Sequence, residues 1–242
     1  MGEKSARLEL RNKGFLAGLS DGLQDEFLSY GKLRKFRAGD FAYHIGDAPG
    51  GMLGIVSGSF GVIVASADET AMCHLIRSGT WFGLAPVLSQ GPRVMSFQAV
   101  EPSEALAVSL ADVHAVGARF PELYRQIGAM SERIVQVTAA RIVGDLLISS
   151  GQRRLAAVLV RLSGVWEGRP PSPIPLSQQA IGQMSNLSRD RVNRFLQELV
   201  GAGCIELRYG SVVVTDPTVL EEIAQHGAEA VSRARSNSKS YR

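Results

Sequence analysis

The sequence contains little cysteine and no long apolar run. Two of its 242 residues are cysteines, Cys73 and Cys204, and they lie far apart without a CxxC spacing. This distribution argues against a disulfide framework and against an iron–sulfur cluster. No apolar run approaches the roughly 20 residues of a membrane helix, and the first ten residues lack the apolar stretch of a secretory signal. We therefore expect a cytoplasmic protein with no membrane partner.

The sequence also lacks the motifs of common enzymes. It contains no GxSxG, P-loop, HExxH or GxGxxG pattern, and no convincing pairing of histidine with serine, cysteine or acidic residues. His74 directly follows Cys73, but adjacent residues on a strand point to opposite faces and do not readily converge on one metal. We expect no catalytic residues, no metal and no haem.

Charge is distributed unevenly along the chain. Residues 1–150 hold 14 Lys and Arg against 15 Asp and Glu, a net charge of −1, whereas residues 151–242 hold 12 against 8, a net charge of +4. A small basic excess suits a nucleic-acid partner, although a solvated surface often carries as much charge.

The order of local patterns predicts an α+β protein. Apolar residues at helical spacing indicate a short helix over Phe15–Tyr30. From Leu33 to Val108, short runs rich in Val, Ile and Phe alternate with glycine-containing turns, which is typical of a β-barrel or jelly roll. A second short helix is expected over 111–120, and another amphipathic helix over 152–164.

Between these parts we predict one long helix, from Pro121 to about Ser149. Its apolar stripe allows two interpretations, a helix packed on its own barrel or the seam of a dimer, and periodicity does not choose between them. The stripe consists of Ile127, Met130, Ile134 and Val137. The predicted domain boundaries lie near residues 120 and 150, which divides the chain into residues 1–120, residues 121–150 with the long helix, and residues 151–242 with a fraying basic tail.

The most informative segment runs from Ile174 to Asp216. Ser177 is a plausible N-cap for a first helix, which ends at a tight turn over 185–187, and Ser188 is a plausible N-cap for a second helix. Two helices joined by so short a turn form a helix-turn-helix. The strand pattern from Cys204 to Val214 predicts a β-hairpin wing beside it.

The exposed side of the second helix carries residues suited to reading bases in the major groove. Arginine presents a planar fork that matches O6 and N7 of guanine, and a short carboxylate accepts from N4 of cytosine. Arg189 and Arg194 are therefore candidate guanine readers, Asp190 is a candidate cytosine reader, and Ser188 suits a phosphate. Solvated surface charges would produce the same pattern. The full set of candidate DNA contacts is Ser177, Gln178, Ser188, Arg189, Asp190, Arg191 and Arg194.

At this point the sequence resembles the cyclic-AMP receptor protein and FNR (CRP/FNR) family of bacterial transcription regulators. The stretch IGQMSNLSRDRVNRFLQELVGAGCI matches the helix-turn-helix of the family nearly position for position, and AGD…IGD…GMLGIVSGSFGVIV and RSGTWFG resemble its barrel. The resemblance covers about residues 15–215. It implies a sensor domain (1–120), a dimerisation helix with its hinge (121–150) along which two copies form a homodimer, and a winged helix-turn-helix DNA-binding domain (151–242). The implied partners are double-stranded DNA that contains an inverted repeat, and RNA polymerase.

The sensor half departs from the pattern that the resemblance implies for cyclic-nucleotide binders. Gly83 is kept, but Leu84 stands where a glutamate would hold the ribose, and Val94 and Met95 stand where an arginine and a serine would hold the phosphate. Arg93 comes one residue early, so on a strand its side chain would face the other way unless a bulge near Gly91–Pro92 restored it.

These departures predict that cyclic AMP is not bound in the usual way, because an anionic phosphate would lack its charged partner. Leu84, Val94 and Met95 would fill the pocket, or the pocket would take another small molecule; Thr138 on the long helix matches a nucleotide-contacting position. Two alternatives stay open. One is a conventional cyclic-nucleotide-activated regulator with a shifted arginine, and the other is a cyclic-nucleotide-responsive subunit whose C-terminal helices contact protein.

Overall fold

A computed structural model of the chain describes residues 2–65, 70–165 and 170–228. The basic tail expected at the end of the chain lies, from residue 229 onward, outside the described residues. The chain divides into two compact units, 1–140 and 141–242, whose junction falls within the predicted 121–150 helix. Each unit is described separately.

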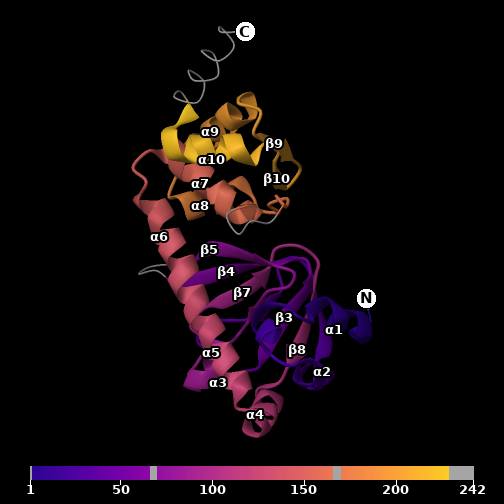
Figure 1. The fold of residues 1–242 in the computed structure, drawn as a ribbon. Helices are drawn as coiled ribbons and strands as arrows, with labels where there is room; N and C mark the ends of the chain where they lie inside the picture. Colours follow the sequence, from indigo (N-terminus) through magenta and orange to yellow (C-terminus); the bar gives the residue numbers. More distant parts are fainter. Residues whose placement is uncertain (1, 66–69, 166–169, 229–242) are drawn as a thin grey trace. The chain divides into compact units, whose positions relative to one another are not determined.

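Two antiparallel four-stranded sheets form the first unit (Figure 1). One sheet has the order β1-β8-β3-β6 and the other β2-β7-β4-β5. The jelly-roll prediction is confirmed, although the sheets face each other as a sandwich and do not close into a barrel. The strands are β1 (Lys32–Phe36), β2 (Phe41–Tyr43), β3 (Met52–Ser57), β4 (Ser59–Ala65), β5 (Thr70–Arg77), β6 (Trp81–Phe82), β7 (Ser96–Ala99) and β8 (Ser103–Val108).

Alternation along the strands gives the first sheet two buried faces. Along β6, Phe82 lies in the core between the two sheets, with Phe60 and Phe97, whereas its neighbour Trp81 lies in a second core beneath the helices. A strand presents successive side chains to opposite faces, so one sheet can serve two cores. The covering helices are α1 (Glu3–Leu10), the 3₁₀ turn η1 (Gly14–Gly18), α2 (Asp21–Ser29), α3 (Ala85–Ser89), α4 (Leu110–Arg119) and α5 (Glu122–Ile134).

The N-terminal helices differ from the prediction. The single helix expected over Phe15–Tyr30 is divided, because Ser20 has extended backbone angles (φ −62°, ψ 152°) and starts α2 after the 3₁₀ turn. Helices α1 and α3 were not predicted. The apolar residues of α1 are few, and only Ala6 and Leu10 are buried, which leaves a weak periodic signal.

The predicted long helix is present as three consecutive helical segments. After α5 come a π-helical turn, η2 (Val135–Ala139), and α6 (Ala140–Leu147). Ile127 is fully buried in the helix-covered core and Met130 packs against it, whereas Ile134 and Val137 are 37% and 47% exposed. The first half of the stripe therefore packs on its own domain. The second half stays uncovered within the single chain.

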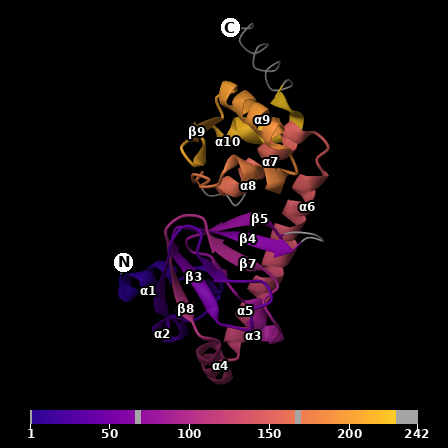
Figure 2. The ribbon, with the colours of Figure 1, turned by 180° about the vertical axis from the view of Figure 1, so that it is seen from behind.

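The second unit contains the helix-turn-helix and its supports (Figures 1 and 2). Helix α10 was not predicted; it packs on α7, where Arg153 Nε donates to the Ala224 carbonyl at 3.1 Å. Among the residues described, no helix is both long and apolar enough to cross a membrane. The elements that follow α6 are α7 (Gly151–Ser163), α8 (Gln178–Ser185), α9 (Arg189–Gly201), β9 (Ile205–Arg208), β10 (Ser211–Val214) and α10 (Pro217–His226).

Trp81 is the largest fully buried side chain of the first unit, which is called the sensor unit below (residues 1–140), and it makes edge contacts with Phe15 and Phe27 at centroid distances of 5.3 and 5.7 Å. We expect Trp81→Ala to lower the free energy of unfolding of the sensor unit by about 3–5 kcal/mol, because it removes apolar contacts and leaves a cavity. Urea unfolding measures the change. Leu88→Ala, at a site that is 47% exposed, is the control, and an equal loss in both variants would contradict the assignment of this core.

Candidate DNA interface and sensor site

The helix-turn-helix is built from α8 and α9 around a three-residue connection. The Ser177 hydroxyl accepts a hydrogen bond from the Ala180 backbone N–H at 3.2 Å, so the predicted N-cap is formed. At the other end of α8, Asn186 takes the left-handed conformation (φ 49°, ψ 55°), a conformation that asparagine tolerates better than most residues. This reversal lets α9 begin at Arg189 immediately after Ser188.

Helix α9 has one buried face and one exposed face. The buried face consists of Val192, Phe195, Leu196 and Leu199. Arg189, Asp190, Arg191 and Arg194 are all exposed on the N-terminal half of the helix, as predicted. Ser188 is exposed too, and its hydroxyl makes no capping bond to α9. The exposed half therefore presents three guanidinium groups, a carboxylate and a hydroxyl to solvent.

The arginines of α9 are only loosely held. The Arg194 guanidinium lies 4.9 Å from the Phe195 ring centroid, and its Nε is 3.9 Å from a Glu198 carboxylate oxygen, with side-chain exposures of 62% and 40%. Arg191 lies 5.8 Å from the same ring. Exposed ion pairs of this kind contribute about 0–1 kcal/mol, so they cost little to exchange for contacts with a ligand.

The turn of the motif depends on Arg154, a residue that the sequence analysis missed. From α7, its guanidinium donates to the carbonyls of Ser185 at 2.6 Å, Asn186 at 3.3 Å and Ile148 at 2.5 Å. Arg154 thus satisfies carbonyls at the C-terminal end of α8 and in the turn, which otherwise lack intrahelical partners. Its sequence signal is only that of one arginine on an amphipathic helix.

Close packing of α8 on α9 favours a glycine at position 182. A Cβ atom on Gly182 would lie 3.1 Å from the Leu187 carbonyl oxygen and 3.1 Å from Val192 Cγ2. The predicted wing is also present, with β9 and β10 paired from Arg208–Ser211 to Ile205–Val214. At its tip the Tyr209 side chain is fully exposed. Gln178, the remaining candidate DNA contact, is half-buried at the start of α8.

In the sensor unit the structure brings Arg93 and Gly83 together. Arg93 is 6% exposed, and its guanidinium donates to the carbonyls of Gly83 at 3.2 Å and Gly51 at 2.7 Å. The Tyr43 ring lies beneath it, 3.9 Å from the guanidinium carbon to the ring centroid. Gly83 has φ +81°, and a Cβ atom there would lie 2.9 Å from both Arg93 Nη1 and the Gly51 oxygen. Only glycine fits here without strain.

The prediction that Arg93 faces away from the pocket is wrong. Residues 91–95 precede β7 and do not form a strand, so the alternation of side chains along a strand does not apply to them. The Arg93 backbone pairs with a neighbouring turn instead, accepting from Gly46 N at 2.7 Å and donating to the Asp47 carbonyl at 2.8 Å. These two bonds fix the side chain inward, without the β-bulge that the alternative required.

The three apolar residues expected to fill one pocket are not brought together. Val94 is 62% exposed, so its predicted place in the pocket is wrong. Leu84 is buried in the helix-covered core at the start of α3, whereas Met95 packs against the core between the sheets. Thr138 is half-buried within the π-helical turn η2. Leu84 nevertheless adjoins Gly83 and offers no carboxylate beside Arg93.

Burial changes the ionisation of the Arg93–Tyr43 pair. Desolvation lowers the pKa of Arg93, and the nearby Tyr43 and Asp47 partly oppose that change. Desolvation also raises the pKa of Tyr43, whose phenol therefore stays neutral. Among the described residues the hydrogen-bond partners of the Arg93 guanidinium are two neutral carbonyls. A buried cation whose hydrogen-bond partners are neutral attracts an anion.

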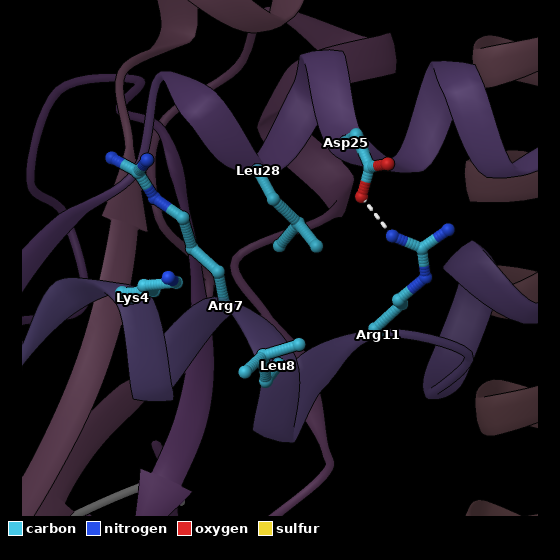
Figure 3. A pocket seen from close by; sticks show the side chains of 6 residues that line it. All are labelled: Lys4, Arg7, Leu8, Arg11, Asp25 and Leu28. Carbon is cyan, nitrogen blue, oxygen red and sulfur yellow. Dashed lines mark hydrogen bonds and ion pairs between the residues drawn. The ribbon is translucent and has the colours of Figure 1, made fainter.

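A shallow depression between α1 and α2 is a poor candidate for a ligand site (Figure 3). It is lined by Lys4, Arg7, Leu8, Arg11, Asp25 and Leu28. Arg11 forms ion pairs with Asp25 and, at 3.2 Å, with Asp21, while Arg7 donates to the Ser29 carbonyl at 3.1 Å. Two of its cations are thus already engaged in holding α1 against α2.

Comparison with known proteins assigns both units. Residues 33–119 match the cyclic nucleotide-binding domain family, and residues 153–223 match the Crp-like helix-turn-helix domain family. The chain is 28% identical to the cyclic AMP receptor protein of Thermus thermophilus over 211 residues, which are 86% of this chain and 94% of that protein.

Solved structures share the fold. The c-di-GMP-responsive global regulator CLP of Xanthomonas campestris has a TM-score of 0.63 at 20% identity, covering 81% of this chain and 99% of that one. FixK2 of Bradyrhizobium japonicum has a TM-score of 0.66 at 16% identity, covering 79% and 96%.

A sandwich of the cyclic nucleotide-binding type followed by a Crp-like helix-turn-helix defines a class of DNA-binding transcription regulators. The chain belongs to the CRP/FNR family of this class, whose members are regulators and not enzymes.

Arg154 provides a test of the turn geometry. We expect Arg154→Ala to lower DNA affinity by about 1.5–3 kcal/mol, the range for hydrogen bonds to charged groups, because α9 loses the support of its turn. Arg153→Ala is the matched control, since its side chain contacts α10 and not the turn. Fluorescence anisotropy with a labelled DNA duplex measures the DNA affinity of both variants. Equal DNA affinities of the two variants would contradict the role assigned to Arg154.

Proposed function

We propose that the chain binds double-stranded DNA at an inverted repeat as a homodimer, with α9 of each copy in the major groove. The observation that carries this proposal is that the apolar face of α9 is buried while Arg189, Asp190 and Arg194 remain exposed. Arg189 and Arg194 would read guanines and Asp190 a cytosine. Phosphates would be contacted by Ser177, Ser188 and Arg191, and Gln178 is a further candidate DNA contact.

The uncovered apolar residues of the long helical segment support the dimer. Ile134 and Val137 of the first unit and Val143, Leu146 and Leu147 of α6 are 37–79% exposed. A second copy packed along this helix would remove them from water, which is favourable at roughly 25 cal/mol per Å² of apolar surface. Two recognition helices would then meet half-sites about 34 Å apart. We further propose a cytoplasmic location and, from family membership alone, RNA polymerase as a partner.

Unbiased selection of DNA sites by the purified protein, with and without cyclic AMP at a stated salt concentration, tests the proposal. We expect one inverted repeat in both samples. Arg189→Ala or Arg194→Ala should relax the preference at one base pair of each half-site, at a cost of about 1–3 kcal/mol. Arg119→Ala, which removes an exposed arginine of the sensor unit, is the control. Enrichment without an inverted repeat would contradict the dimer, and no salt-sensitive DNA binding would favour the protein-contact alternative.

For the sensor we propose an anionic effector that is held by Arg93, with cyclic AMP not bound in the usual way. The inward guanidinium supports an anion, while Leu84 in place of a carboxylate leaves the ribose hydroxyls of a nucleotide without a partner. The inward Arg93 also favours the second candidate, a conventional cyclic-nucleotide regulator with a shifted arginine. The two candidates differ in the affinity for cyclic AMP.

Calorimetric titration with cyclic AMP, cyclic GMP, cyclic di-GMP and inorganic phosphate separates these candidates. We expect weak cyclic AMP binding by the wild type and loss of anion binding in Arg93→Ala, with Arg37→Ala, at an exposed position, as the control. Tight, stoichiometric binding by the wild type would establish the conventional candidate instead.

A further inference from the structure

Helix α6 buries its acid and exposes three of its large apolar residues. Among the eight residues of α6, all of which the structure describes, Asp145 is the buried one, at 3% exposure. Val143, Leu146 and Leu147 are 55%, 45% and 79% exposed. A helix packed on its own domain normally does the reverse. The apolar side of α6 therefore suits a partner helix, while its attachment to the second unit depends on a charged group.

The partner of Asp145 lies in the last turn of α7. Arg161 Nε donates to Asp145 Oδ2 at 2.7 Å, and the two side chains are 1% and 3% exposed. The other carboxylate oxygen, Oδ1, lies 3.1 Å from Nε of Arg141, which is 37% exposed. Both oxygens thus face a guanidinium group. Burying charges is costly unless they are paired in good geometry, so this arrangement tolerates little rotation of α6 against α7.

The ion pair gives α6 a second attachment besides the chain itself. Only residues 148–150 connect α6 to α7, and a single short connection acts as a pivot. The pair joins points that are 16 residues apart, so it fixes the direction of α6 against α7. Helix α7 in turn holds the turn before α9 through Arg154. A series of directed polar contacts therefore runs from α6 to the recognition helix within this unit.

We propose that the Asp145–Arg161 pair is a positioning device that sets the direction of the recognition helix relative to α6 and thereby the spacing of half-sites that the dimer accepts. This inference rests on the proposed dimeric binding of an inverted repeat. If two copies meet along their helices, the angle at which each DNA-binding domain leaves α6 determines the distance between the two α9 helices. Neither residue contacts DNA, so sequence preference within a half-site is independent of the pair.

The test replaces both partners at once, because removing one would leave a buried charge unpaired and destabilise the domain. Asp145→Leu combined with Arg161→Met keeps similar volumes but supplies only non-directional apolar contacts. Asp25→Asn is the matched control, since it converts a carboxylate paired with an arginine at an exposed position of the sensor unit. Thermal unfolding establishes that both variants are folded. The probes are duplexes carrying the selected inverted repeat, the same repeat with one or two base pairs added or removed, and a single half-site.

For the wild type and the control we expect each spacer change to weaken binding by about tenfold, equivalent to about 1.4 kcal/mol, since one base pair turns a half-site by roughly 35°. The double variant should bind the single half-site like the wild type but show a nearly flat dependence on the spacer. A double variant with the wild-type spacer dependence would overturn this inference and leave the proposed function standing. A wild type that binds the inverted repeat no better than a half-site would overturn the proposed function and this inference with it.

Discussion

Helix α9 can expose one polar face only because its other face is buried, and the second unit is arranged around that constraint. Phe195 and Leu199 need apolar neighbours, which α7, α8 and the wing provide. The approach of α8 is close enough to favour glycine at position 182, and Asn186 takes a left-handed conformation in the turn between the helices. Packing therefore decides where the polar face of α9 points, and solvent exposure leaves its arginines available.

In the sensor unit, packing also determines where a charged side chain points. Its first sheet is buried on both faces, so it can carry helices on one side and a second sheet on the other. The segment after α3 is then free of strand pairing until β7 and can turn Arg93 inward over Tyr43. A cation enclosed by carbonyls and a ring is an unusual element of a core. Its position beside Gly83 is the observation on which the proposed anionic effector rests.

Several elements could be predicted from local patterns, and others could not. The helix-turn-helix carries caps, a turn and an apolar face within 25 residues, so each signal supports the next. Helix α1 has too few buried residues to show a period, and the role of Arg154 depends on carbonyls that lie 31 and 32 residues further along the chain. The predicted direction of Arg93 is wrong because residues 91–95 form a loop, in which the alternation of a strand does not hold. The backbone bonds to Gly46 and Asp47, almost fifty residues away, set its direction.

The sequence by itself determined the order of the elements, the class of each domain and the residues that α9 exposes, because these follow from period, capping and turn chemistry over short distances. Tertiary structure alone decided which charged side chains are buried and which groups they contact. Asp145 and Arg161 belong to two helices whose sequence patterns do not indicate that either residue is buried and paired. Arg93 donates to the carbonyls of Gly51 and Gly83, which lie far from it in the sequence. Burial of a charge depends on the whole surrounding core, and no local stretch of sequence contains that information.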